Sequence, residues 1–275
     1  VTQANRRCRK RLCARLFGGS GGLRFRTYLD VFDREGDGLV KKPPIDQEHY
    51  DSSSYFEGEN ANHLTDLRSS FQQYRIGKVT EIRPPNCDDR VVDLGCGWGT
   101  FCFALADQER EVIGIDFSAK SIELCEERLA SSGQKNVRFV RADASDTGLP
   151  SASFSLVIAA DLFEHLYPED SKSVAAEAFR ILAPGGHFVA WTPHRGHFIE
   201  IMKNNNFILE NDVTHVDYKS MGDMRRLLGS VGFMIEKAYY AESHLPGLRI
   251  LEKYLHSFIP PLRRRIAVLA TKSGA

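Results

Sequence analysis

A short apolar segment that runs into three closely spaced glycines constrains this chain more than any other feature. Residues 90–94 are mostly apolar, include Asp93, and are followed by Gly95, Gly97 and Gly99. Such a run is typical of a buried parallel strand, and open α/β sheets bind ligands at the carboxyl ends of their strands. Glycines let the backbone turn sharply and let a ligand lie close to the main chain. The segment therefore predicts a strand, a tight turn and a binding site.

Strand-like and helix-like segments alternate through the rest of the chain. We expect strands at 90–94, 111–115, 137–140, 154–159, 186–191, 233–239 and 266–271. We expect helices at 66–82, 98–107, 118–131, 171–182 and 220–231, with Pro184-Gly185-Gly186 ending the fourth core helix and starting the fifth strand. Alternation of this kind predicts an α/β fold with a doubly wound, mostly parallel sheet. The last two strands lack the usual helical return, so we expect the seventh strand to be antiparallel.

Composition excludes several classes of protein. The chain has 36 Lys and Arg against 36 Asp and Glu, which argues against a general nucleic-acid binder. Its six cysteines include no CxxC pair, so zinc and thioredoxin chemistry have no support. Neither an 18-residue apolar run nor a signal-peptide pattern is present, so we expect a cytoplasmic protein, with membrane association as the alternative.

Residues 91–99, VVDLGCGWG, resemble motif I of the class I S-adenosylmethionine (SAM)-dependent methyltransferases. The similarity extends over about residues 66–271 and is to the small-molecule and quinone-type O-methyltransferases. The competing dinucleotide-binding pattern, GxGxxG, fits poorly because its third glycine would be Thr100. The resemblance implies a Rossmann-like methyltransferase fold, SAM as the cofactor and S-adenosylhomocysteine as the product.

Two further elements of a SAM site follow motif I in the order that the family shows, and a third lies before it. Asp116 ends the expected second strand, where an acid accepts hydrogen bonds from both ribose hydroxyls; a plain helix-capping acid is the alternative. Asp143 follows the third strand, where the family binds the adenine amino group. Arg75 lies 18 residues before Asp93, where quinone-type relatives pair an arginine with the methionine carboxylate; an exposed helix charge is the alternative. The expected cofactor-binding residues are Arg75, Asp93, Gly95, Cys96, Gly97, Asp116, Phe117, Asp143, Ala144 and Ala159.

The chemistry is expected after the fourth strand, in the segment Asp161-Leu162-Phe163-Glu164-His165. Methyl transfer needs the nucleophile in line and close, and a hydroxyl acceptor also needs a base. Glu164-His165 matches the EHL signature of small-molecule methyltransferases, which implies catalytic roles for both, with His165 as the base. Orientation of Glu164 by His165, or simple packing, is the alternative.

A metal is the second interpretation of this segment. In ubiquinone-pathway O-methyltransferases, E-x-x-E-H at this position binds a divalent metal, and the present chain has an aspartate in place of the first glutamate. We expect no metal, and we keep Mg²⁺ held by Asp161, Glu164 and His165 as the alternative.

Substrate contacts are expected on two further segments at the same sheet edge. His194 and Arg195 follow the fifth strand, and His215 lies in a H-x-x-[YF] stretch typical of many relatives. Hydrogen bonding within the loops is the alternative. Residues 241–263 form an insertion that is expected to be a core-packing or lid helix, with an interfacial helix near anionic lipid as the alternative.

The expected organisation has three parts: a partly disordered N-terminal extension at 1–48, a helical cap at 49–85, and a methyltransferase domain at 86–275. We expect a monomeric or homodimeric enzyme that methylates a small-molecule, glycan or lipid-linked acceptor at oxygen. It would have no sequence-specific nucleic-acid partner, and peripheral membrane contact stays open. An N- or C-methyltransferase and a non-catalytic SAM-binding regulatory or scaffold subunit are the alternatives.

Overall fold

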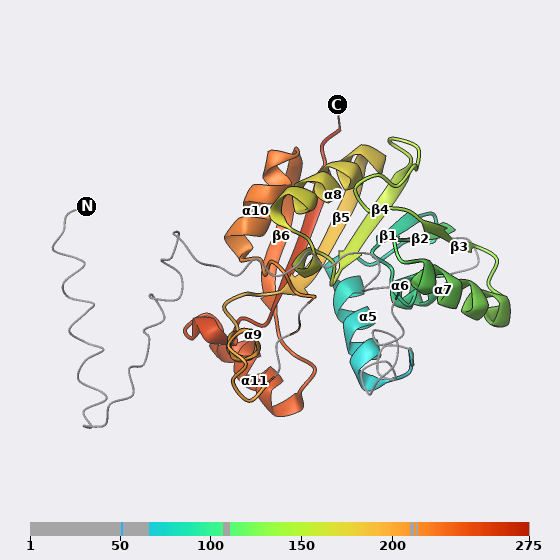
Figure 1. Cartoon of the computed structure of the whole chain (residues 1–275). Coiled ribbons are helices and arrows are strands. Elements are labelled where there is room, and N and C mark those ends of the chain that lie inside the picture. The colour runs from blue at the N-terminus through green and yellow to red at the C-terminus, as the bar shows by residue number, and fades with distance from the viewer. Residues whose placement is uncertain (1–50, 52–65, 107–110, 210–211, 213, 275) are drawn as a thin grey trace, which may run out of the picture. The chain divides into compact units, whose positions relative to one another are not determined.

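A single seven-stranded sheet organises the computed structural model, which describes residues 51, 66–106, 111–209, 212 and 214–274 (Figure 1). The N-terminal extension expected at 1–48 lies outside the described residues. The strands are β1 (Arg90–Leu94), β2 (Glu111–Asp116), β3 (Val137–Arg141), β4 (Phe154–Ala160), β5 (Leu182–Pro193), β6 (Phe233–Ala241) and β7 (Arg265–Lys272). The α-helices are α5 (Ser70–Ile82), α6 (Thr100–Leu105), α7 (Ala119–Ser132), α8 (Pro168–Ile181), α9 (Phe198–Asn204), α10 (Met221–Ser230) and α11 (Pro246–Leu255).

The strand order is β3-β2-β1-β4-β5-β7-β6. Strands β1 to β5 pair in parallel, whereas β7 pairs antiparallel with both β5 and β6. The predicted α/β class and the antiparallel seventh strand are therefore confirmed. The order changes direction beside β1, which is the position where open α/β sheets bind ligands.

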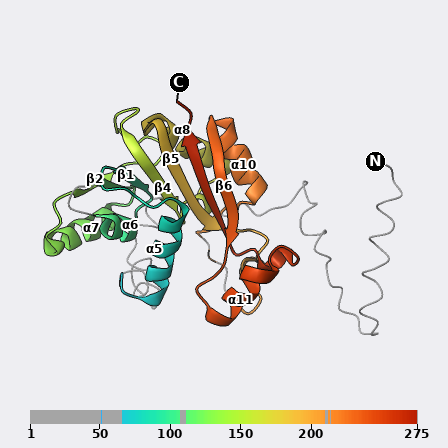
Figure 2. The ribbon, with the colours of Figure 1, turned by 180° about the vertical axis from the view of Figure 1, so that it is seen from behind.

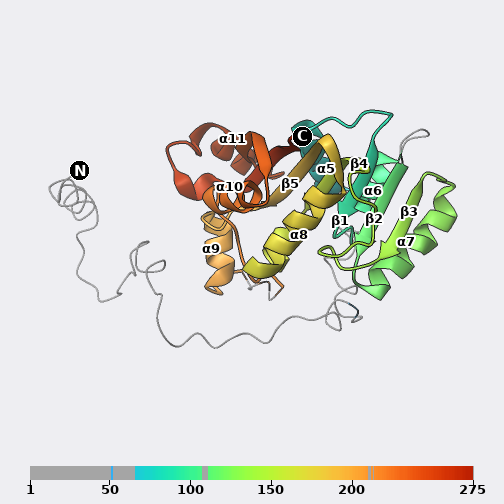
Figure 3. The same cartoon turned by 90° about the horizontal axis from the view of Figure 1, so that it is seen from above.

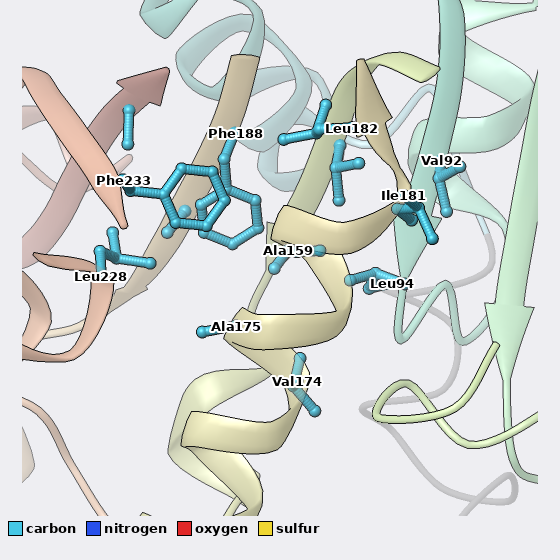
Figure 4. Close-up of a cluster of buried hydrophobic side chains, with 14 of the residues drawn as sticks. Val92, Leu94, Ala159, Val174, Ala175, Ile181, Leu182, Phe188, Leu228 and Phe233 are labelled. Atoms are coloured by element: carbon cyan, nitrogen blue, oxygen red, sulfur yellow. The ribbon is translucent and has the colours of Figure 1, made fainter. Parts of the chain in front are cut away.

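Two apolar clusters fill the space on either side of the sheet. Successive side chains of a strand point to opposite faces, so Val92 belongs to one cluster and its neighbour Val91 to the other. Helices α8 and α10 cover the first cluster, in which Phe188 stacks on Phe233 (Figures 3 and 4). Residues of α5 and α6, with Cys125 of α7, cover the second. This burial on both faces explains the nearly continuous apolar runs of the central strands.

Local sequence signals set the helix boundaries. Ser118 caps α7 by accepting a hydrogen bond from the Ser121 amide, and Gly133 ends the helix with a φ of 71°. Ser220 and Asp223 form a reciprocal capping box at the start of α10. These caps fix the entry of each helix after its strand.

The expectation about where the fifth strand begins was wrong. Helix α8 ends at Ile181 and β5 begins at Leu182, so Pro184, Gly185 and Gly186 lie inside the strand. The register shifts between Phe154 and Leu156 of β4, which accommodates the extra residues as a bulge. After β5, residues 194–197 form a turn, and the short helix α9 that follows was not among the expected helices.

Helices α9 and α11 lie at the edge where β4 and β5 end (Figure 1), and Figure 2 shows α11 there from the opposite side. β7 starts at this same edge because it runs antiparallel to β5. The turns after β1, β2 and β4 therefore share an edge with the start of β7. Within the described residues, no helix combines the length and the apolar character needed to cross a membrane.

Candidate active site

The glycine turn after β1 leaves its main chain open at one point. The amides of Gly95 and Cys96 both donate to the carbonyl of Ile115, at 2.9 Å, which ties the turn to β2. Gly97 has a φ of 50°, and a Cβ there would meet no atom of the described residues within 4 Å. A Cβ on Gly95 would instead come within 2.8 Å of the Leu162 side chain. Within the described part of the chain, Gly97 is thus the uncovered position of the turn, where a ligand can approach the backbone.

Asp116 lies at the end of β2, beside the glycine turn. Its Oδ2 accepts from the Gly97 amide at 2.8 Å and its Oδ1 accepts from the Ser118 amide at 3.0 Å. Burial raises the pKa of Asp116, and these two hydrogen bonds act in the opposite direction. Each carboxylate oxygen can accept more than one hydrogen bond. The residue therefore bridges the turn and α7 while keeping acceptor capacity.

Asp93 lies below the turn in a closed environment. It is 1% exposed, and Cys102 of α6 donates to its Oδ2 at 3.5 Å. Burial raises the pKa of Asp93 to about 7, although the Cys102 hydrogen bond and the Arg75 charge act in the opposite direction. Cys96 is buried in the same apolar cluster. The Asp93 carboxyl is therefore directed toward α6 and is closed off from solvent.

The remaining expected cofactor residues lie in different settings. Asp143 is exposed in the turn after β3, where its Oδ1 accepts from both the amide and the hydroxyl of Ser145 at 2.7 Å, and Ala144 beside it is half-buried. Phe117 is half-buried, and its carbonyl accepts from Arg141. Ala159 is fully buried in the cluster under α8. Its methyl group packs in the core, so its side chain offers no surface to a ligand.

A buried ion pair network occupies the end of β4. Asp161 has a φ of 56°, a left-handed conformation that aspartate tolerates better than most residues. Arg75 donates to its Oδ2 at 3.0 Å through Nε, and Arg265 donates to its Oδ1 at 2.6 Å. Burial alone would raise the pKa of Asp161, but the two arginines hold it below its usual value. Asp161 is therefore an ionised acid whose two oxygens are both engaged.

Glu164 has the opposite electrostatic environment. It is 1% exposed, Thr192 donates to its Oε2 at 2.9 Å, and Arg265 approaches its Oε1 only to 4.0 Å. Burial raises its pKa, the Asp161 charge raises it further, and Arg265 offsets only part of this effect. Neighbouring acids with pKa values displaced in opposite directions are typical of sites that handle protons.

We expect Glu164→Gln to stabilise the protein at pH 8 but not at pH 4. The unfolded carboxyl releases its proton near pH 4.5, whereas the folded carboxyl holds it to a higher pH. The free energy of unfolding therefore falls as pH rises from 4.5 toward the raised pKa, and glutamine removes that dependence. A gain of about 1–3 kcal/mol is expected, since a tenfold change in proton affinity corresponds to about 1.4 kcal/mol. Thermal unfolding at the two pH values measures it.

Glu177→Gln is the matched control for this substitution. Burial raises the pKa of Glu177, but hydrogen bonds from Arg180 and Thr147 outweigh it and lower the pKa. Its contribution to stability is present above pH 4.5 and is lost as pH falls. Glu177→Gln should therefore destabilise the protein at pH 8. A loss of stability for both variants at pH 8 would contradict the raised pKa of Glu164.

His165 and His215 lie side by side beyond Glu164. The His165 Nδ1 donates to the Thr214 carbonyl at 3.1 Å, which places the basic electron pair of the neutral ring on Nε2. The two imidazoles meet edge to face with centroids 4.8 Å apart, and the Tyr218 hydroxyl lies 2.7 Å from the His215 Nδ1. Burial lowers the pKa of His165, and it lowers that of His215 to about 4. Both rings are therefore neutral near pH 7.

One possible metal-binding group exists among the described residues. Ligand atoms of Glu164, His165 and His215 all lie within 4.8 Å of one another. Asp161, expected as a ligand in the metal alternative, is not part of this group because Arg75 and Arg265 hold its oxygens. The group in the structure therefore contains a second histidine, His215, where Asp161 was expected.

The other two residues expected to contact the substrate, His194 and Arg195, lie in different environments. His194 is 8% exposed, its ring meets Tyr240 edge to face, and its Nδ1 has no hydrogen-bond partner among the described residues. Burial lowers its pKa to about 4. Arg195 is exposed and lies 3.4 Å from the Asp223 carboxylate at the start of α10. His194 thus faces inward and Arg195 outward.

Sequence reasoning missed the role of Arg265. This residue begins β7 and places one guanidinium between Asp161 and Glu164, about 100 positions earlier in the chain. In the sequence it stands out only as part of a run of three arginines. No local pattern could reveal the contact, because it depends on β7 starting at the carboxyl edge of β5.

The arrangement joins an open glycine turn to a cluster of proton-handling groups. Strands β1 and β4 are direct neighbours, and the turn after β1 touches Leu162 in the segment after β4. A ligand on Gly97 and Asp116 would have Glu164 and His165 just after the adjacent strand β4, with His215, from the segment before α10, beside them. This geometry suits a bound cofactor that reacts with a second molecule beside a neutral histidine.

Comparisons with known proteins agree with this geometry. Residues 91–186 match the family model of a methyltransferase domain. The chain is 29% identical over 146 residues to a probable S-adenosylmethionine-dependent methyltransferase of Mycolicibacterium smegmatis, over 53% of this chain and 52% of that one. It is 25% identical over 150 residues to a ubiquinone biosynthesis O-methyltransferase of Leptothrix cholodnii, over 54% and 59%. The chain spans little more than half the length of these relatives.

The fold is also similar to that of solved structures. The YcgJ protein of Bacillus subtilis superposes with a TM-score of 0.57 at 16% identity, over 74% of this chain and 100% of that one. At this identity the likeness shows the fold alone.

Proposed function

Because the chain carries a methyltransferase domain of the class I, SAM-dependent family, we propose that it transfers a methyl group from SAM to a small-molecule, glycan or lipid-linked acceptor at oxygen. The single observation that carries this proposal is that the open glycine turn after β1 lies next to the cluster of Glu164, His165 and His215, because the first two follow β4, the neighbour of β1. The oxygen acceptor is supported by the neutral histidine and by the O-methyltransferase among the relatives.

SAM would lie across the ends of β1 and β2. Asp116 has acceptor capacity for the two ribose hydroxyls, and Gly97 leaves room for the cofactor against the main chain. Asp143 and Ala144 would meet the adenine. Arg75 would meet the methionine carboxylate, in competition with Asp161, to which it is already bonded. SAM would supply a sulfonium-bound methyl group, which an aligned nucleophile displaces.

His165 would act as the general base. Its Nδ1 donates to Thr214, so its Nε2 can take the proton of an acceptor hydroxyl. The charges of Asp212 and Asp161 favour the protonated imidazole and would stabilise it once the proton has moved. Glu164, whose pKa is raised, would donate a hydrogen bond to the acceptor in its protonated form. His194, Arg195 and His215 are proposed to contact the acceptor.

Mg²⁺ does not fit the residues of this site. Mg²⁺ is bound by carboxylates, water and substrate oxygens, whereas two of the three possible ligands here are imidazoles. The carboxylate of Asp161 is engaged by two arginines. The proposal therefore assigns proton removal to His165 without a metal.

Two alternatives remain distinguishable by product. The fold and the cofactor turn do not decide whether oxygen, nitrogen or carbon is methylated, so an N- or C-methyltransferase shares every feature of the cofactor site. A regulatory or scaffold subunit would bind SAM and form no S-adenosylhomocysteine. Formation of S-adenosylhomocysteine that depends on an acceptor separates the enzymes from the subunit.

We expect label from methyl-labelled SAM to enter an extractable product when the protein is incubated with an extract of the source cells. The products are partitioned between organic and aqueous phases, with and without EDTA. Label in the organic phase identifies a lipid-linked acceptor, and label in the aqueous phase identifies a soluble metabolite or glycan. EDTA should leave the incorporation unchanged, because His165 removes the proton directly.

Two results would overturn parts of the proposal. SAM binding without label in either phase would favour the regulatory subunit. Loss of label with EDTA would assign a metal to Glu164, His165 and His215 instead of a base. A heat-inactivated protein sample controls for methyltransferases of the extract.

A further inference from the structure

Helix α11 and the turn after it expose a continuous apolar stripe. The stripe consists of Ile250, Leu251, Tyr254, Leu255, Phe258 and Ile259, which recur at intervals of four residues. Ile250 is 61% exposed, Tyr254 66% and Phe258 83%. Single exposed apolar residues are ordinary, but a contiguous stripe on one helix marks an interaction surface.

Helix α11 presents its apolar side to solvent, whereas an ordinary surface helix presents its polar side. Its acid, Glu252, is 1% exposed and points into the protein, where Oε1 lies 3.0 Å from the His197 Nε2 and Oε2 accepts from the Ser243 amide. Burying a charge is costly unless partners of this kind compensate it. The chain thus holds a buried acid in place on the inner side of α11 while the apolar side faces outward.

The exposed charges of the α11 segment have one sign. Arg249 and Lys253 are exposed beside the stripe, and Arg249 also lies 3.3 Å from the largely buried carboxylate of Glu242. Within residues 243–264 the sole acid is the buried Glu252, so no exposed acid lies on this segment. A complementary surface must therefore be apolar at its centre and negatively charged around it.

We propose that the α11 stripe docks on the surface of an anionic lipid bilayer. Apolar side chains would enter the region between headgroups and acyl chains, while Arg249 and Lys253 contact anionic headgroups. A second copy of this chain fits less well, because a two-fold interface would place Arg249 and Lys253 of one protomer against the same charges of the other. One helix face is also smaller than the area that a stable dimer buries.

The location of α11 gives this surface a functional meaning. The helix lies at the edge of the sheet where β4 and β5 end (Figure 2). Arg265, just after the insertion, lies 2.6 Å from Asp161 and 4.0 Å from Glu164. Docking would hold that edge near the membrane. Lipid binding is measured in the absence of SAM and of a methyl acceptor, so its outcome does not depend on the proposed methyl transfer.

Sedimentation with phosphatidylcholine vesicles, with and without phosphatidylglycerol, tests the proposal. We expect binding to the anionic vesicles and little to the neutral ones. Phe258→Ser should weaken binding about 10-fold, because it removes one large apolar side chain that the bilayer would bury. Arg249→Gln with Lys253→Gln should weaken it about 10- to 30-fold and selectively on anionic vesicles, since each basic residue near the surface contributes a few-fold.

Matched substitutions far from α11 provide the controls. Met234→Ser removes an exposed apolar residue at the start of β6, and Lys237→Gln with Arg138→Gln removes two exposed cations. These variants should bind as the unchanged protein does. Absence of binding, equal binding to neutral vesicles, or equal loss in the control variants would overturn the proposal. A concentration-dependent dimer that Phe258→Ser dissolves would overturn it in favour of a second copy.

Discussion

Asp116→Ala is expected to weaken the binding of SAM and S-adenosylhomocysteine by at least about 100-fold. A hydrogen bond to a charged acceptor contributes about 1.5–3 kcal/mol, and the carboxylate is proposed to accept two from the ribose. The carboxylate also holds the Gly97 amide at 2.8 Å, so its loss loosens the turn on which the cofactor would lie. Calorimetric titration with S-adenosylhomocysteine measures the effect.

Two further variants separate recognition from folding. Asp116→Asn keeps one acceptor oxygen and the size of the side chain, so it should lose less affinity than the alanine variant. Asp88→Ala removes an exposed acid just before β1, at the opposite end of that strand from the glycine turn, and should bind as the unchanged protein does. Unchanged affinity in Asp116→Ala with normal thermal unfolding would remove the ribose from this position.

The parts of the fold that local sequence determines were predicted well. β1 and its glycine turn are specified by a few adjacent residues, since apolar side chains fill both faces of the sheet and the glycines adopt positive φ. The boundaries of β5 were not predicted correctly, because Pro184-Gly185-Gly186 forms a bulge that only the pairing of β5 with β4 reveals. A proline and two glycines ordinarily interrupt a strand, and here tertiary pairing overrides that tendency.

The site shows the same division between local and distant information. Glu164 and His165 could be identified from their own motif, and the structure places them beside His215. The partners of Asp161 could not, because Arg75 precedes it by 86 positions and Arg265 follows it by 104. These arginines explain why the aspartate of the motif is a salt-bridged structural acid, whereas the glutamate three residues later has a raised pKa.

His165→Ala is expected to lower turnover by about 100- to 10,000-fold while leaving the affinity for S-adenosylhomocysteine unchanged. His165 lies in the turn after β4, the strand next to β1, and is not among the residues proposed to hold the cofactor. Burial lowers the pKa of His165 below 6.5, so the unchanged enzyme should keep its activity to a pH below that value and lose it at more acidic pH. Label transfer from methyl-labelled SAM to the cell extract, measured across pH, reports the turnover and its pH dependence. Calorimetric titration with S-adenosylhomocysteine reports the affinity.

His165→Asn distinguishes a base from a residue that only positions its neighbours. The asparagine amide can donate to the Thr214 carbonyl, as the Nδ1 of His165 does at 3.1 Å, but it cannot take a proton. A general base predicts that the asparagine and alanine variants are equally inactive, whereas a positioning role predicts recovery in the asparagine variant. His187→Ala changes a histidine in the distant half of β5, beside Glu236, and should retain full turnover. Full turnover in His165→Ala would contradict His165 both as a base and as a metal ligand, and the proton would then have to leave through Glu164 or the solvent.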